Sequence, residues 1–353
     1  MHLRQYIVVI AIILMGWGFI SAVSMGSKKQ KENDLAVLHL KGKVKTMRSI
    51  MYLAYLDSGK LKRVEQPELT GDKLQSSFEE SYNEMGYKTV ERNLTNEGKI
   101  TGTTILKYNK RNYLIEELNY NSSGNLINRI SFRNDSAGNI TAVIGYGPNR
   151  KPYVKDSNVY DSSGNVIEEL EYSDGKLWSF HQFIYDKKGN RIEWDDYNRV
   201  ENKFHTGLKF RYDDKGNEIE QDDDDQNSRI VMMYDEKGNE IVKTEYEKGC
   251  LYKVDSCKYD EENNLLERVS YSQGRTSFET KEIYKYDKEG NEIQDEYVYG
   301  PDALKTVITN GGSSILTKLT TYEYDKKGNW TKQVVHNKGQ KKYYVTERTF
   351  TYY

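Results

Sequence analysis

The sequence predicts an all-β fold: a long antiparallel β-meander of tandem hairpin repeats, coiled into an elongated or barrel-like sheet. The pattern Tyr-Asp-x-x-Gly-Asn recurs in full at six places among the 353 residues. The segments between the copies are rich in aromatic and β-branched residues, which favour extended backbone. A second, weaker glycine turn falls between most copies, so one strand and one turn together take about 13 residues.

The repeat unit is best seen in residues 210–219, and its Asp and Gly each have a structural reason. The Asp side chain can bond to its own turn backbone, and the Gly accepts the positive φ that a Cβ penalises. The full copies begin at Tyr160, Tyr185, Tyr212, Tyr234, Tyr286 and Tyr324, and the looser ones at Tyr82, Tyr108, Asn134 and Tyr259. About twenty strands exceed what an open twisted sheet holds before it curls or splits.

Apolar residues recur at three fixed places around the turn Gly. An aromatic or Met stands six residues before it, Tyr four before it and Ile three after it in most copies, as in Phe210, Tyr212 and Ile219. Whether Tyr and Ile lie on the same face of the sheet depends on the length of the turn between them. A two-residue turn between Asp and Gly puts them on one face, whereas a type I turn with a Gly bulge puts them on opposite faces, so we expect the two-residue turn. The remaining positions are charged, which predicts one packed and one wet face.

The N-terminus has the layout of a secretory signal over residues 1–24. His2 and Arg4 precede an apolar run over residues 7–20, and residues 22–24 are small enough for a signal peptidase. The run is shorter than the roughly 20 residues that span a bilayer. A cleaved signal is therefore the prediction, with an uncleaved N-terminal anchor as the alternative. Either implies an exported protein of the periplasm, the cell surface or the extracellular space.

Three segments follow. Residues 25–36 read as a polar linker, residues 37–81 as an opening β-hairpin region with a turn at residues 57–60, and residues 82–353 as the β-repeat domain. The repeat loses phase near residues 222–225, which are four consecutive Asp, and near residues 311–314. The acidic run fits a solvated turn better than a calcium loop, because consecutive side chains on a strand point to opposite faces. Function is expected near these breaks in phase.

Composition excludes several classes of function. The formal net charge is −2, which is no basis for binding nucleic acid. No phosphate-binding Gly loop, zinc motif or serine-hydrolase elbow is present, and the five histidines are scattered. We expect no enzymatic activity, no cofactor and no metal.

Aromatic residues are the candidate ligand contacts. Tyrosine stacked across strands stabilises a sheet, but the same rings on a concave face can stack on sugar rings or extended peptides. Trp178, Trp194 and Trp330 are the strongest candidates, because exposed Trp is costly without a use. Asp195 and Asp196, beside Trp194, can accept hydrogen bonds from sugar hydroxyls.

The Tyr-Asp-x-x-Gly-Asn copies at residues 160, 185, 212, 234, 286 and 324 resemble the YD repeat of Rhs and teneurin proteins, here in a short exported bacterial form. The resemblance covers residues 82–353 in phase. It implies an extracytoplasmic β-sheet spiral, and such repeats are often described as carbohydrate-binding. This chain carries Asn after the Gly, where many family repeats carry Arg. The resemblance transfers no catalytic residue.

The leading hypothesis is an exported or cell-envelope repeat protein that acts as a binding or interaction scaffold, with carbohydrate as the candidate ligand. One alternative is a structural or protein-partner module related to Rhs systems, in export, shell or immunity. The other is a hydrolase with a carboxylate pair. The expected partners are a glycan or an envelope protein, with no nucleic acid. Membrane contact is expected only through the N-terminal segment, if it stays uncleaved.

Overall fold

The computed structural model describes residues 33–64, 77–148, 152–173, 175–198, 200–274, 277–301 and 315–353. The described residues form one short helix, α1 (Asp34–Val37), and one 23-stranded antiparallel sheet. No described helix is long and apolar enough to cross a membrane. The strands are β1 Val44–Asp57, β2 Lys60–Arg63, β3 Ser77–Tyr82, β4 Lys88–Leu94, β5 Ile100–Tyr108, β6 Leu114–Asn121, β7 Leu126–Asn134, β8 Ile140–Tyr146, β9 Pro152–Tyr160, β10 Val166–Ser173, β11 Lys176–Tyr185, β12 Arg191–Asn198, β13 Lys203–Tyr212, β14 Glu218–Asp223, β15 Ser228–Tyr234, β16 Glu240–Glu247, β17 Cys250–Tyr259, β18 Leu265–Ser272, β19 Thr280–Tyr286, β20 Glu292–Tyr299, β21 Ile315–Tyr324, β22 Trp330–Asn337 and β23 Lys342–Tyr352.

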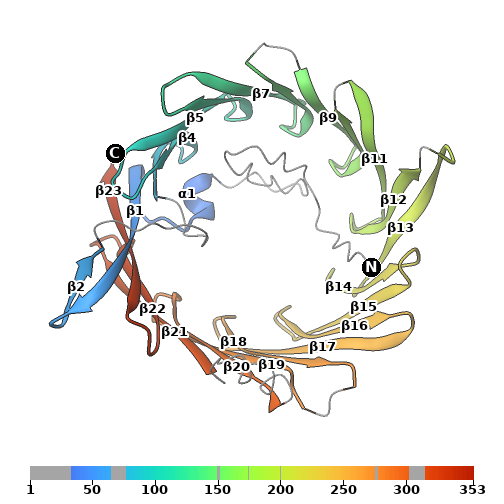
Figure 1. Ribbon diagram of the computed structural model, residues 1–353. Coiled ribbons are helices and arrows are strands. Elements are labelled where there is room, and N and C mark those ends of the chain that lie inside the picture. The colour runs from blue at the N-terminus through green and yellow to red at the C-terminus, as the bar shows by residue number, and fades with distance from the viewer. Residues whose placement is uncertain are drawn as a thin grey trace.

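The sheet closes on itself between its first and last long strands. β1 pairs with β23 over almost its whole length, from Val44 opposite Tyr352 to Tyr55 opposite Lys342. The same strand pairs with β3 on its other side, and β2 pairs only with the far end of β1. Leaving β2 aside, the strands form a closed ring of 22 in which each strand pairs with the next one along the chain and β23 pairs with β1 (Figure 1). The predicted all-β meander and its barrel-like closure are confirmed.

Only part of the N-terminal region for which predictions were made lies among the described residues. The predicted signal over residues 1–24 and residues 25–32 of the linker lie outside the described residues. The last residues of that linker begin α1, where the side chain of Asn33 accepts from the backbone N–H of Ala36 as an N-cap. Within the predicted opening hairpin region, β1 pairs with β2, with Ser58 and Gly59 in the turn between them. Residues 311–314, at the second break in phase, also lie outside the described residues.

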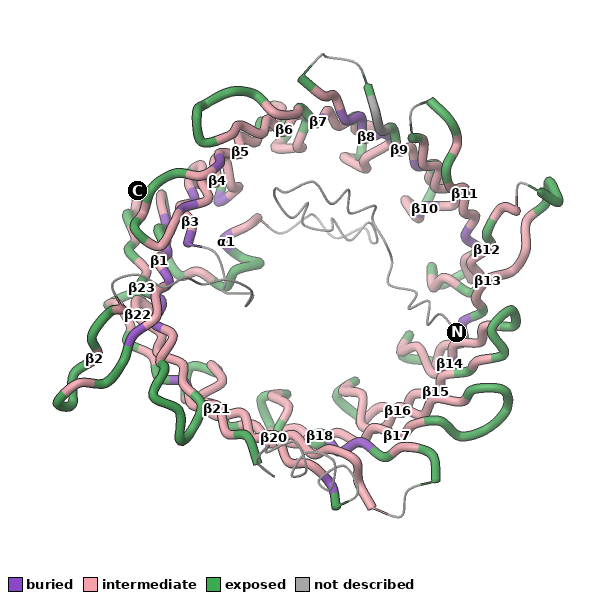
Figure 2. The backbone as a smooth tube through the Cα atoms, viewed as in Figure 1, coloured by how far each residue is buried: buried purple, intermediate pink, exposed green. Residues whose placement is uncertain are grey.

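The ring is wide. Neighbouring strands lie about 4.8 Å apart, so a ring of 22 strands has a circumference of roughly 100 Å and a diameter of at least about 34 Å. Side chains from opposite walls cannot meet across such a ring, so, apart from the place where α1 packs, no second layer of described residues covers either face of the sheet. Only fifteen apolar side chains are buried among the described residues, and most of the tube in Figure 2 is half-buried or exposed. The prediction of one packed and one wet face is wrong for this reason.

The contacts of α1 identify the inner face of the sheet. The helix lies within the ring (Figure 1), and Leu35 packs with Val44, Met47 and Tyr82. The side of β1 that carries Met47 therefore faces inward. Residues directly opposite each other on two paired strands point to the same face of the sheet. The register of each strand pair therefore shows which residues of the next strand face inward. Met47 is opposite Phe350 on β23 and opposite Glu80 on β3.

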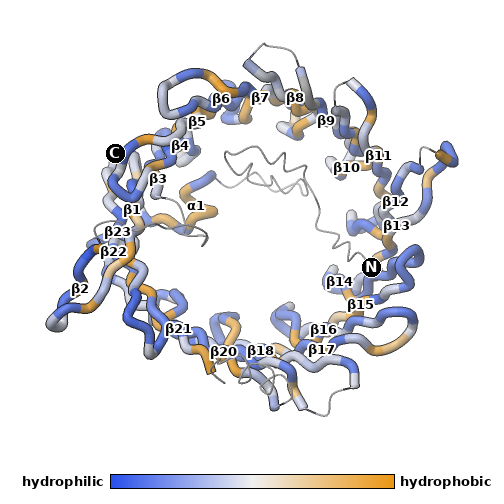
Figure 3. Tube along the Cα trace, in the orientation of Figure 1, coloured by the Kyte–Doolittle hydropathy of each residue, from blue (hydrophilic) through white to orange (hydrophobic). Residues whose placement is uncertain are grey.

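The outer face carries ion pairs that run across neighbouring strands. Glu116 on β6 binds Lys107 at 2.6 Å and Arg129 at 2.5 Å, which joins β5, β6 and β7. A second such trio joins β17, β18 and β19 through Glu267. Figure 3 shows hydrophilic and hydrophobic stretches alternating around the whole ring. Charged chains of this density indicate an outer surface in contact with water.

The repeated turn differs from the predicted one. In the β13–β14 hairpin, the N–H of Gly216 donates to the carbonyl of Asp213, and the N–H of Asp213 donates to the carbonyl of Asn217. Gly216 has φ +89°, so the turn is type I followed by a Gly bulge, with three residues in its loop. The expectation of a two-residue turn is wrong.

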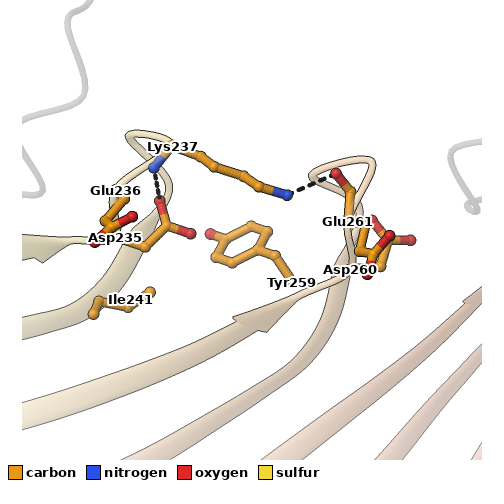
Figure 4. A pocket seen from close by; sticks show the side chains of 7 residues that line it. All are labelled: Asp235, Glu236, Lys237, Ile241, Tyr259, Asp260 and Glu261. Carbon is orange, nitrogen blue, oxygen red and sulfur yellow. Dashed lines mark hydrogen bonds between the residues drawn. The ribbon is translucent and has the colours of Figure 1, made fainter.

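The Gly bulge shifts the pairing of the two strands by one residue, and a second bulge in the same hairpin shifts it by one more. In the same hairpin Tyr212 pairs with Glu218 and Arg211 pairs with Glu220, which leaves Ile219 as an extra residue. Two one-residue insertions together keep the register even. As a result Ile241, which follows one turn, and Tyr259, which precedes the next, line the same cavity (Figure 4). The two bulges thus let apolar positions of successive repeats meet, through a mechanism that the sequence pattern did not reveal.

In seven repeats the tyrosine hydroxyl ties its turn to a backbone carbonyl of the preceding hairpin. The hydroxyl of Tyr212 donates to the carbonyl of Arg191 at 2.9 Å. Equivalent bonds are made by Tyr108, Tyr160, Tyr185, Tyr234, Tyr259 and Tyr286. Asn134 replaces Tyr in one repeat, and its side-chain amide donates to the carbonyl of Leu114 at 2.9 Å. The repeated Tyr is therefore a polar link between hairpins as well as an apolar residue.

Replacing Tyr212 with Phe should lower the free energy of unfolding by about 1 kcal/mol, because the carbonyl of Arg191 loses its donor while the ring is kept. Urea denaturation followed by circular dichroism measures the change. Tyr252→Phe is the matched control, since that residue is 46% exposed and its hydroxyl bonds to no described residue. Equal effects of the two substitutions would contradict a role for the hydroxyl link.

The turn Asp residues should make the fold sensitive to acid. Hydrogen bonds from the side chain and backbone N–H of Asn239, with the N–H of Lys237, hold the pKa of Asp235 below its usual value despite partial desolvation. The pKa is lowered at all eight described Asp turns: Asp135, Asp161, Asp186, Asp213, Asp235, Asp260, Asp287 and Asp325. Such groups stabilise the fold above their unfolded pKa, about 3.9, and lose this as pH falls through the folded value.

We therefore expect the urea midpoint to fall steeply as pH is lowered from 5 towards 2. Asp235→Asn should make that decline shallower, while Asp214→Asn, at an exposed turn position, should not. A midpoint that does not change over this range would show that the turn carboxylates do not stabilise the fold.

Candidate functional site

The inward surface of strands β9 to β12 gathers an unusual set of side chains. The register of β3 to β9, followed from Met47, places Asp156 on the inner face. Asp156 is directly opposite Glu171 on β10. Glu169, two residues earlier on the same face, is directly opposite His181 on β11. The neighbouring strands thus put three carboxylates and an imidazole on one patch.

The charges of the three carboxylates of the patch act on one another. No described residue forms an ion pair with Asp156, Glu169 or Glu171. Partial burial and the charges of Glu171 and Glu169 raise the pKa of Asp156 to about 6. Burial and the charge of Glu169 also raise the pKa of Glu171. Like charges directly opposite on a sheet destabilise it, and perturbed carboxylates of this kind cluster at functional sites.

Both ring nitrogens of His181 are engaged. Its Nε2 lies 2.5 Å from the Oγ of Ser179, two residues earlier on the same face of β11. Its Nδ1 lies 2.5 Å from the Oδ1 of Asp196, its register partner on β12. The Nε1–H of Trp194 donates to the same Oδ1 at 2.9 Å, and its nitrogen lies 3.1 Å from Nδ1 of His181. Burial of the ring lowers the pKa of His181, but the carboxylates of Asp196, Glu169 and Glu171 outweigh this and raise it.

Trp194 stands at the centre of an aromatic cluster. Its ring lies 5.8 Å from that of Phe183 and edge-on to His181 at 5.5 Å. The guanidinium of Arg191 lies 5.5 Å from the Trp194 ring and 5.2 Å from that of Phe210. These contacts hold the indole in one orientation, with its N–H aimed at Asp196.

The structure brings together only some of the residues that the sequence predicted as a site. Trp194 and Asp196 lie side by side in the patch. Asp195 follows on the opposite face of β12, opposite Gln182. Trp178 is the extra residue of a bulge against Glu171 and Tyr172 and is 70% exposed.

Trp330 belongs to a different part of the ring. It lies on β22, across the ring from β12 (Figure 1). The guanidinium of Arg348 stacks on its ring at 3.5 Å, which leaves this indole face covered. Trp330 therefore does not contribute to the β9–β12 patch.

Sequence reasoning missed Ser179, His181 and the three carboxylates. The signal present was the Ser-x-His spacing, which puts both side chains on one face of a strand. Recognising Asp196 as the partner of His181 needs the register. The expected two-residue turn would have placed His181 opposite Trp194, whereas the two bulges shift it to Asp196.

Two other places that could bind a ligand are less favourable, because carboxylates at both places already have partners within the protein. A cavity of about 560 Å³ lies between two successive turns, lined by Asp235, Lys237, Tyr259 and their neighbours (Figure 4). The carboxylate of Asp235 is already occupied by its own turn. At the acidic run, Asp224 binds Lys209 at 2.8 Å and Asp222 lies 3.7 Å from Arg229. The described residues include no group of three or more acidic, His or Cys side chains placed to hold a metal.

No family model and no curated protein sequence matches the chain. Among solved structures it is similar to the toxin complex TcdB2-TccC3-TEV, at 13% identity and a TM-score of 0.27 over 76% of this chain. The chain spans 19% of the length of that toxin chain. It is also similar to a porin-like protein from Bacteroides uniformis, at 9% identity and a TM-score of 0.24, over 88% of this chain and 99% of the other. At these scores neither likeness supports an argument about function, and the YD-repeat resemblance depends on the motif alone.

Proposed function

We propose that the chain is an exported binding scaffold that holds a carbohydrate on the inner face of β9 to β12. The observation that carries the proposal is the group Asp156, Glu169 and Glu171, which has no cation among the described residues and lies beside the Trp194 cluster. Sugar hydroxyls donate to carboxylates, and sugar C–H faces pack on aromatic rings. The wide ring gives a polymeric ligand access to this face. Export is supported by the signal-like residues 1–24, and the ligand class by the YD-repeat resemblance.

A glycan array followed by calorimetry on the full chain tests the ligand. Glu171→Gln should weaken binding about 10-fold or more, because a hydrogen bond to a charged acceptor contributes about 1.5–3 kcal/mol. Glu168→Gln, three residues earlier and on the outward side of β10, is the matched control and should leave the affinity unchanged. Absence of binding to every envelope glycan, or equal loss in both variants, would overturn the proposal.

The hairpin of β1 and β2 favours a second function, a protein-partner module. It projects away from the ring (Figure 1), and Tyr55 and Leu56 near its tip are 45% and 53% exposed. β2 pairs on one side only among the described strands, and such an edge can accept a strand from another protein. A stoichiometric envelope-protein partner that is lost on Leu56→Lys, with no effect of added sugar, would favour this function over carbohydrate binding.

A further inference from the structure

The geometry points to an esterase site at Ser179, His181 and Asp196, and we propose that the inner face of β9 to β12 hydrolyses a short acyl ester. The motif-based expectation was that the chain has no enzymatic activity. Catalytic serine sites, however, are recognised by the geometry and roles of three side chains and not by their order in the sequence. The substrate class named below depends on the proposed carbohydrate function, whereas the chemistry of the three side chains does not.

The backbone alone brings the three side chains together. Ser179 and His181 are two residues apart on one strand, so both face inward. Asp196 is the register partner of His181 across the β11–β12 pair. When the side chains take rotamers that allow hydrogen bonds between these neighbours, the bonds run in series from the hydroxyl to the imidazole to the carboxylate.

Each residue has one role. Asp196 accepts from Nδ1–H of His181, which leaves Nε2 as the basic nitrogen facing the Oγ of Ser179 at 2.5 Å. Trp194 donates to Asp196 and holds the carboxylate in place, so it is a positioning residue. Ser179 is only half-buried, and its hydroxyl can be reached by a substrate. The nucleophile thus lies within hydrogen-bond distance of the base, and the base within hydrogen-bond distance of the group that orients it, as a catalytic serine requires.

The reaction balances with water as the second substrate. The Oγ of Ser179 attacks the ester carbonyl carbon while its proton passes to Nε2 of His181. The tetrahedral intermediate collapses, the bond from carbon to the alkoxy oxygen breaks, and the proton on Nε2 goes to the departing alcohol. Water then attacks the acyl-serine, giving its proton to Nε2. Release of the carboxylic acid returns that proton to Ser179.

The surroundings select the ester. Asp156, Glu169 and Glu171 repel anionic substrates, so a neutral or cationic alcohol is favoured. On the proposed carbohydrate function, the substrate is a sugar that carries a small O-acyl group. His181 must be neutral to act as base. The carboxylates that face it, Glu169 and Glu171 from β10 and Asp196 from β12, raise its pKa, so the rate should increase with pH through a value above the ordinary one of about 6.5.

The test uses the folded full chain with two probes that need no sugar: a fluorophosphonate, mapped by mass spectrometry, and 4-nitrophenyl acetate. The expected result is an adduct on Ser179 that denaturant abolishes, and acetate release that rises with pH as described. Ser179→Ala and His181→Gln should abolish both. Asp196→Asn should lower the rate at least about 100-fold, and Trp194→Phe should lower it less while shifting the pH profile.

Ser256→Ala, on the outward face of β17, is the control and should leave both readouts unchanged. Circular dichroism establishes that each variant is folded. No adduct on Ser179 in the folded chain, or labelling and hydrolysis that persist in Ser179→Ala, would overturn the esterase site. Glycan binding is measured separately, so its failure with intact labelling would remove the sugar substrate and leave the site.

Discussion

Met47→Ala is expected to lower the free energy of unfolding by about 2–5 kcal/mol, the usual range for truncating a buried methionine. Met47 is 2% exposed and packs with Leu35, Val44 and Tyr82. This cluster joins α1, β1 and β3 beside the pairing of β1 with β23, so a cavity there weakens the place where the ring closes. The change is measured as a shift of the urea midpoint.

Met233→Ala is the matched control, because Met233 is 57% exposed. It should change the free energy of unfolding by no more than about 0.5 kcal/mol. If the two substitutions had equal effects, the cluster around Met47 would not be a core of this protein.

Glu80→Ala is expected to cost about 3 kcal/mol. Glu80 is 7% exposed, and it accepts from the Nζ of Lys88 at 2.9 Å and from the hydroxyl of Tyr82. Its charge also opposes the burial that lowers the pKa of Arg348 to about 10. Without Glu80 the guanidinium stays buried against Trp330 with less compensation, and an uncompensated buried charge is costly.

The control for Glu80 is Glu323→Ala, since the side chain of Glu323 is 69% exposed and its ion pair with Lys332 is 3.6 Å long. That substitution should cost less than about 1 kcal/mol. A second variant, Glu80→Ala with Arg348→Met, should recover part of the loss. Failure to recover any stability would show that the buried guanidinium is not the reason for the cost.

The strands and turns of this fold could be predicted because their causes are local. Asp213 and Gly216 bend the chain by their own backbone chemistry, and the aromatic flanks extend it. The same local reasoning chose the wrong turn, since both a two-residue turn and a pair of bulges keep Tyr212 and Ile219 on one face. The observed turn has hydrogen bonds that Asn217 donates to the Asp213 carboxylate, which a hydropathy pattern does not contain.

Closure and the candidate site are not local, and the sequence pattern did not predict them in detail. Thr46 and Thr351 meet across 305 residues, and no periodic signal marks them as partners. Ser179 and His181 were visible as neighbours on one strand, but Asp196 joins them only through a register set by two bulges. Trp194 and Asp196 were predicted as ligand contacts, and the structure gives them a position beside His181.

Cross-linking of the first and last strands tests the closed ring most directly. Thr46 and Thr351 are register partners with their Oγ1 atoms 2.6 Å apart, a geometry that suits a disulfide. In a background of Cys250→Ser and Cys257→Ser, the pair Thr46→Cys and Thr351→Cys should oxidise to an intramolecular disulfide that joins the two strands. The pair Thr320→Cys and Val335→Cys, register partners within one hairpin, shows that the oxidation conditions suffice. A closed ring predicts both disulfides, and formation of the hairpin disulfide without the one between residues 46 and 351 would contradict it.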